Sequence, residues 1–77
     1  MFTRNIKLSS IDDVKMFVSE VTKCAYDVDL SSGRYVVDAK SIMGIFSLNL
    51  SEAIKLTVHS NDEKECGDFL EFVKRFE

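Results

Sequence analysis

The sequence is poor in the features that mark membrane, secreted and metal-binding proteins. It contains no run of about 18 apolar residues, so we expect no membrane span, and it lacks the basic-then-apolar start of a signal peptide. Its two cysteines, Cys24 and Cys66, fit neither a disulfide framework nor the spacing of a metal site. We therefore expect both cysteines to be reduced thiols on the apolar side of helices, and the protein to be cytoplasmic.

Histidine is scarce as well, since His59 is the only one. A single histidine without a paired acidic constellation leaves no visible catalytic triad or metal site, so we expect neither enzyme activity nor a cofactor. Because His59 falls near the end of a predicted strand, on its polar face, we interpret it as a solvent-exposed strand residue. Basic residues are not in excess either, and the net charge of −3 argues against direct binding to nucleic acid.

What is present is the composition of an ordinary globular domain. Of the 77 residues, 45% are hydrophobic and 30% are charged, which excludes the composition of a disordered chain. Six phenylalanines and two tyrosines supply large apolar side chains to a small core. We find no internal repeat and no linker, so we expect residues 1–77 to form a single domain.

The first third of the chain predicts a strand followed by a helix. Apolar and polar residues alternate over 2–8, apart from Arg4 on the apolar face, and this pattern is typical of a half-buried strand. Ser10 is then a natural N-cap, with acidic residues in the first turn where the helix dipole favours negative charge. A helical stripe follows, formed by Ile11, Val14, Phe17, Val18, Val21 and either Cys24 or Ala25.

The rest of the chain predicts three more strands and two more helices. Alternation over 26–30 and 35–39, with a turn at 31–33, predicts a hairpin, and alternation over 54–58 predicts a fourth strand. Between them a short helix is expected from Ser41 to about Leu48, stopped near Asn49, a residue type that tolerates the left-handed conformation.

The last helix opens at Asn61 and Asp62 and has one apolar face, formed by Cys66, Phe69, Leu70, Val73 and Phe76. Gly67 weakens this helix, so we expect it where a neighbouring element comes close. The predicted order is β-α-β-β-α-β-α. Alternating apolar faces favour an α+β fold, with a four-stranded antiparallel sheet that carries its three helices on one face.

Residues 40–48 form the most informative segment, Lys-Ser-Ile-Met-Gly-Ile-Phe-Ser-Leu. Ser41 caps a short helix whose flank is unusually hydrophobic. The segment resembles the regulatory-serine segment of HPr, the phosphocarrier of the bacterial phosphotransferase system. Thr22-Lys23 followed by Tyr26-Asp27-Val28 is similar to the end of the family's first helix and its second strand. The resemblance implies the HPr-like open-faced β-sandwich, in the element order given above.

The expected active-site segment differs from the family pattern. HPr places Gly-(Ile or Leu)-His-Ala-Arg-Pro where the first strand gives way to the first helix. Counting back from Ser41 without gaps puts Ser10 at the histidine position, Asp12 at the arginine and Asp13 at the proline. A serine does not form phosphohistidine, and carboxylates repel the phosphate that an arginine would hold. By resemblance the chain is similar to the catabolite-repression HPr paralogues; by its residues alone, this segment is also a well-capped helix start.

The resemblance implies that Ser41 is phosphorylated by an HPr kinase, with Lys40 offsetting part of the new charge. Lys40, Ile42, Met43 and Phe46 would then form a docking patch, although Ser41 as a simple cap and the apolar residues as core packing remain alternatives. Asp12 is expected near Ser41, where it would repel a phosphate.

Three functions stay open. The first is a regulator of sugar transport and carbon catabolite repression, bound by a sugar-responsive transcriptional repressor or by other phosphotransferase-system proteins. The second is a divergent phosphocarrier, which would take phosphate from Enzyme I through His59 if anywhere. The third is an interaction module in which neither phosphorylation survives.

Overall fold

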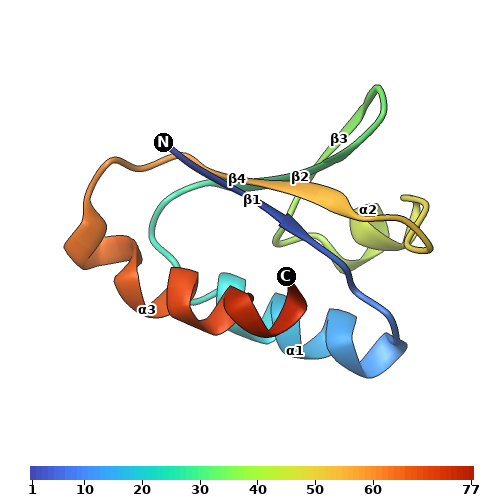
Figure 1. The fold of residues 1–77 in the computed structure, drawn as a ribbon, viewed down its shortest axis with the longest axis horizontal. Coiled ribbons are helices and arrows are strands. Elements are labelled where there is room, and N and C mark those ends of the chain that lie inside the picture. The colour runs from blue at the N-terminus through green and yellow to red at the C-terminus, as the bar shows by residue number, and fades with distance from the viewer.

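The chain folds in the order that the sequence predicts. A computed structural model describes residues 1–77 (Figure 1). Its elements are β1 (Phe2–Ile6), α1 (Ile11–Val21), β2 (Val28–Ser32), β3 (Tyr35–Asp38), α2 (Ile42–Phe46), β4 (Ile54–Val58), α3 (Glu63–Val73) and a terminal 3-10 turn, η1 (Lys74–Phe76). None of the helices is long and apolar enough to cross a bilayer.

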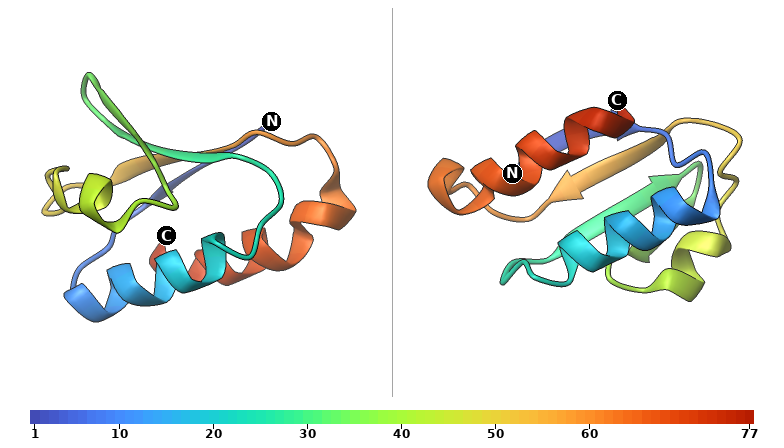
Figure 2. Two further views of the ribbon diagram at one scale, coloured as in Figure 1. Left: turned by 180° about the vertical axis from the view of Figure 1, so that it is seen from behind. Right: turned by 90° about the horizontal axis from the view of Figure 1, so that it is seen from below.

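The four strands form one antiparallel sheet in the order β1-β4-β2-β3. β1 runs along β4 from the Phe2↔Val58 pair to the Ile6↔Ile54 pair. The helices lie on one face of this sheet, with α1 and α3 side by side, and the other face is open (Figures 1 and 2). The expected open-faced sandwich is therefore confirmed.

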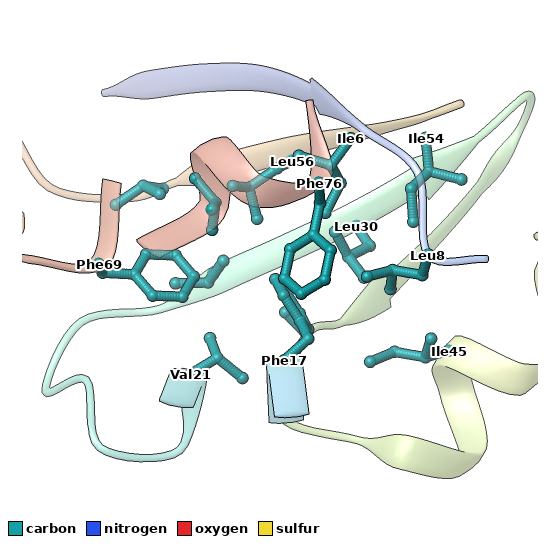
Figure 3. Close-up of a cluster of buried hydrophobic side chains, with 14 of the residues drawn as sticks. Ile6, Leu8, Phe17, Val21, Leu30, Ile45, Ile54, Leu56, Phe69 and Phe76 are labelled. Atoms are coloured by element: carbon teal, nitrogen blue, oxygen red, sulfur yellow. The ribbon is translucent and has the colours of Figure 1, made fainter. Parts of the chain in front are cut away.

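The core lies between the sheet and the helices. It contains 18 buried residues, all of them apolar, and no polar side chain is buried with them. Phe17 stands at its centre (Figure 3), with its ring centroid 6.0 Å from that of Phe69 and 6.3 Å from that of Phe76. Three aromatic rings from α1, α3 and η1 therefore hold the helices to each other as well as to the sheet.

Local chemistry accounts for where the elements begin and turn. The Asp62 carboxylate accepts the backbone N–H groups of Lys64 and Glu65, at 2.9 and 3.3 Å, and so caps α3. The hairpin turn consists of Gly33 and Arg34 and not of residues 31–33 as predicted, because Ser31 and Ser32 still pair with β3. Gly33 has a φ of 59°, which only glycine adopts without strain, and this explains why the turn centres there.

The predicted α1 stripe is wrong at both ends. Ile11 is 61% exposed. A helical side chain lies over the turn that precedes it, and the first residue of a helix has no preceding turn to cover. α1 ends at Val21, so Cys24 lies in the following loop and not on a helix. Two hydrogen bonds of the tighter 3-10 type end the helix. They run from Lys23 N–H to Glu20 O and from Cys24 N–H to Val21 O.

Two other expectations about backbone positions are also wrong. Asn49 is not left-handed, since Gly33 is the only residue with a positive φ. α2 ends instead at Phe46, and its C-cap Ser47 donates its hydroxyl to the carbonyl of Gly44 at 2.5 Å. Gly67 has no neighbouring element, because a Cβ built there meets no atom within 4 Å. The glycine that does occupy a close approach is Gly44, where a Cβ would lie 3.2 Å from the Cβ of Val37.

Candidate functional site

Ser41 is the exposed N-cap of α2, as predicted. Its Oγ accepts the backbone N–H of Gly44 at 3.2 Å, and its own N–H donates to the carbonyl of Asp38 at 3.0 Å. The absence of a side chain at Gly44 lets α2 approach both this hydroxyl and β3. The serine is thus held in one place with its oxygen at the surface.

Lys40 does not direct its charge at Ser41. Its Nζ donates to the carbonyl of Cys24 at 2.9 Å, and its backbone N–H donates to the Asp38 carboxylate at 2.9 Å. The ammonium group therefore ties the α2 segment to the loop after α1. To neutralise a phosphate on Ser41, Lys40 would have to exchange this hydrogen bond for the new one.

The residues after Ser41 divide between core and surface. Ile45 is buried, and Ile42 is half-buried against the core. Met43 is 77% exposed and Phe46 is 44% exposed, which is a large apolar area for a helix of five residues. Of the predicted docking patch, Met43 and Phe46 are thus open to a partner, whereas Ile42 mainly supports the helix.

A hollow that the sequence did not reveal extends this apolar surface. It measures about 440 Å³ and lies between the start of α1 and the end of α2. Its lining residues are Leu8, Ser9, Ser10, Ile11, Phe46, Leu50 and Ser51. Ile11, which was predicted to be core, and Leu50 therefore join Phe46 at the surface. The only available signal was the place of Ile11 directly after its N-cap.

The start of α1 is a self-contained cap. Ser10 Oγ accepts the Asp13 N–H at 3.1 Å, and the Asp13 carboxylate accepts the Ser9 N–H at 3.1 Å. The Asp12 side chain is exposed and forms no hydrogen bond or ion pair. This end of the helix already carries two carboxylates, and they oppose the binding of an anion to its remaining N–H groups.

His59 lies at the other end of the sheet from Ser10. It follows the end of β4, where β4 pairs with the start of β1, whereas Ser10 follows the end of β1. The Nε2 atom of its ring is 2.6 Å from the Asp29 carboxylate, and its backbone N–H donates to the backbone carbonyl of Asp27. His59 is exposed as expected, but this carboxylate partner was not predicted, because it depends on which strand lies beside β4. No three acidic, cysteine or histidine side chains are arranged to hold a metal ion.

The two cysteines flank Tyr26. Cys66 is buried and Cys24 is half-buried, and both are free thiols. Burial raises the pKa of the Tyr26 phenol well above its usual range, and both neighbouring thiols act in the same direction. Tyr26 and Cys66 belong to the core, and Cys24 packs against it in the loop to which Lys40 donates its hydrogen bond.

Comparisons with known proteins agree with this fold. A crystal structure of HPr-C-His from Thermoanaerobacter tengcongensis superposes with a TM-score of 0.76 at 23% identity, covering 96% of this chain and 92% of that chain. A phosphocarrier protein HPr from Bacillus anthracis str. Ames superposes with a TM-score of 0.72 at 24% identity, covering 99% and 96%. At these identities the two structures show a shared fold. A search of curated proteins gives no match.

The sequence itself matches a family model. The model describes the PTS HPr component phosphorylation site and matches residues 13–75, so it begins after Ser10 and Asp12 and includes Ser41. Because the match covers most of the chain and the fold agrees, this chain belongs to the HPr family of the phosphotransferase system.

Proposed function

We propose that this chain is a regulatory HPr-like protein, phosphorylated on Ser41 by an HPr kinase and not a carrier of phosphohistidine. The observation that carries the proposal is the exposed Ser41 hydroxyl beside the exposed side chains of Met43 and Phe46. An acceptor hydroxyl and an apolar docking surface thus occur together on α2. The partners of such a protein are the kinase and a sugar-responsive transcriptional repressor or other proteins of the system.

The surroundings of Ser41 are compatible with a phosphate. The Oγ already accepts the Gly44 N–H, and phosphate oxygens can accept the same donor without unwinding α2. A phosphoserine carries about −1.5 to −2 charges at pH 7, so it would also attract the Lys40 ammonium from the carbonyl of Cys24. Phosphorylation would then loosen the contact between α2 and the loop after α1, and this change is available for a partner to recognise.

The start of α1 gives no matching support for phosphohistidine. Ser10 uses its oxygen as the helix cap, and Asp12 and Asp13 supply negative charge where a phosphoryl group would sit. His59 is too far along the sheet to replace Ser10, and its Nε2 is occupied by Asp29. Enzyme I would therefore find no histidine to phosphorylate at the start of α1.

The test is the intact mass of the protein after incubation with an HPr kinase and ATP. Wild type gains one phosphate, and Ser41→Ala gains none. Ser47→Ala is the matched control, because it removes a second exposed hydroxyl from the same helix segment and should be modified like wild type. If no variant is modified while ordinary HPr is modified in parallel, the proposal is wrong, which leaves the interaction module and the divergent phosphocarrier.

The docking surface has its own control. Met43→Ser removes the most exposed apolar side chain of α2, so we expect slower phosphorylation with an unchanged fold. Met16→Ser makes the same substitution at an exposed methionine on α1 and should leave the rate unchanged. Equal rates for the two variants would mean that Met43 does not contact the kinase.

A further inference from the structure

β3 is a free edge of the sheet that carries large apolar side chains. It pairs with β2 on one side only. Tyr35 is 74% exposed and Val36 is 65% exposed. The β2–β3 hairpin also projects beyond the other strands (Figures 1 and 2). Such an edge is a template for pairing with another strand, unless charge or a covering element blocks it.

The hydrogen-bond pattern defines which backbone groups of β3 are available. Ala39 N–H donates to the carbonyl of Val28, so Ala39↔Val28 is a hydrogen-bonded pair of the β2–β3 ladder. Every second pair along the ladder is hydrogen-bonded in the same way. Asp29↔Asp38 and Ser31↔Val36 are the intervening pairs. In an antiparallel ladder the backbone groups of intervening residues point away from the partner strand. Val36 therefore presents both its N–H and its C=O group to the free edge. Asp38 presents its N–H there, while its carbonyl already accepts the Ser41 N–H.

We propose that two copies of this chain pair β3 against β3 in antiparallel register, with the twofold axis at Val36. Each Val36 then exchanges two backbone hydrogen bonds with the partner's Val36. In this register Arg34 lies opposite the partner's Asp38, and Asp38 lies opposite the partner's Arg34. A register shifted by two residues would instead place Arg34 beside the partner's Lys40, where like charges repel. The inference does not depend on Ser41 or its phosphorylation.

The charges of the isolated chain favour this register. Asp38 stands directly opposite Asp29, and with Asp27 and His59 these residues line a hollow of about 400 Å³ on the open face. Within this hollow the Asp29 carboxylate contacts His59 Nε2, the Asp38 carboxylate accepts the Lys40 N–H, and no lysine or arginine side chain pairs with any of the three carboxylates. Arg34 is exposed and forms no ion pair in the isolated chain, although it borders a second hollow with Glu52. A partner's Arg34 would bring the missing positive charge to the acidic hollow.

The expected dimer is weak. A four-residue edge buries far less than the roughly 1,200 Å² of a stable complex. We expect sedimentation equilibrium to detect a species of twice 8.8 kDa as the concentration rises to about 1 mM. Amide chemical shifts should change with dilution at Arg34, Val36 and Asp38, and should stay constant on β1, the other edge.

Charge reversal tests the register. Arg34→Glu places two acidic residues opposite each other at both ends of the pair, and Asp38→Arg places two arginines there. Each variant alone should dimerise at least about tenfold more weakly than wild type. An equal mixture of the two should associate again, because each chain then meets its opposite charge. Lys55→Glu makes the same charge change on the open face of β4 and should leave the dimer intact.

Val36→Pro tests the backbone contact, since it removes the outward N–H and should abolish the dimer. Thermal melts of all variants establish that each is folded. Wild type that stays monomeric at about 1 mM would overturn the proposal, and so would a dimer that survives Val36→Pro in folded protein. If the mixed variants fail to associate, the register is wrong.

Discussion

Replacing Gly67 with alanine should stabilise this protein. Gly67 lies within α3 and is exposed, and a Cβ built on it meets no atom within 4 Å. Alanine therefore contributes its full helix preference over glycine, about 1 kcal/mol, with no opposing contact. For a domain of this size, that corresponds to a rise in melting temperature of about 4–8 °C.

The same substitution at Gly44 should not give this gain. There the Cβ would lie 3.2 Å from the Cβ of Val37 and 3.3 Å from the Oγ of Ser41, tighter than ordinary contact. The clash between α2 and β3 offsets the helix preference, so we expect Gly44→Ala to be neutral or destabilising. Urea unfolding of wild type and both variants, with an unchanged slope, measures the difference. An equal gain at both glycines, or none at Gly67, would refute this reading of the packing.

Three further outcomes follow from the core and the caps. Phe17→Ala should lower the free energy of unfolding by about 3–5 kcal/mol, because Phe17 is fully buried between two other rings; a loss below 1 kcal/mol in urea titration would contradict this. Burial raises the pKa of the Tyr26 phenol, so the unfolded state releases its proton first. Stability should therefore fall as the pH rises above about 10, and Tyr26→Phe should lose this dependence in urea titrations at several pH values. Ser10→Ala should lower the free energy of unfolding by about 1 kcal/mol through loss of the α1 cap; an unchanged free energy in urea titration would contradict this.

Local signals were enough to predict the element order and both caps. Ser10 and Ser41 each directly precede a segment with helical spacing of apolar residues. A serine at this position accepts a free N–H group of the first helical turn, whatever surrounds the helix. The buried alternate residues of β4 follow in the same way from a period of two.

The errors came from features that depend on tertiary neighbours. Ile11 fits the α1 stripe by angle, but nothing lies over the first turn to bury it. Gly67 was predicted to lie at a close contact, but the glycine at a close contact is Gly44, where α2 packs against Val37 of β3. The Lys40–Cys24 hydrogen bond and the His59–Asp29 contact join segments far apart in the chain, so no local pattern reports them.

In the candidate site too, local features were predictable and features that depend on tertiary neighbours were not. Ser41, Met43 and Phe46 are exposed on α2, as the 40–48 segment indicates. The hollow that Phe46 shares with Ile11 and Leu50 arises only when α2 packs beside the start of α1. A partner that docks on α2 would therefore contact α1 as well, which the sequence did not reveal.

The central claim is that phosphate enters this protein at Ser41 and not at a histidine. The most direct measurement offers both donors in parallel, an HPr kinase with ATP and Enzyme I with phosphoenolpyruvate, and locates the phosphate by peptide mass spectrometry at neutral pH. We predict one acid-stable phosphate on the peptide that contains Ser41, from the kinase reaction only. An acid-labile phosphate on the His59 peptide, from the Enzyme I reaction, would contradict the account and make the chain a phosphocarrier.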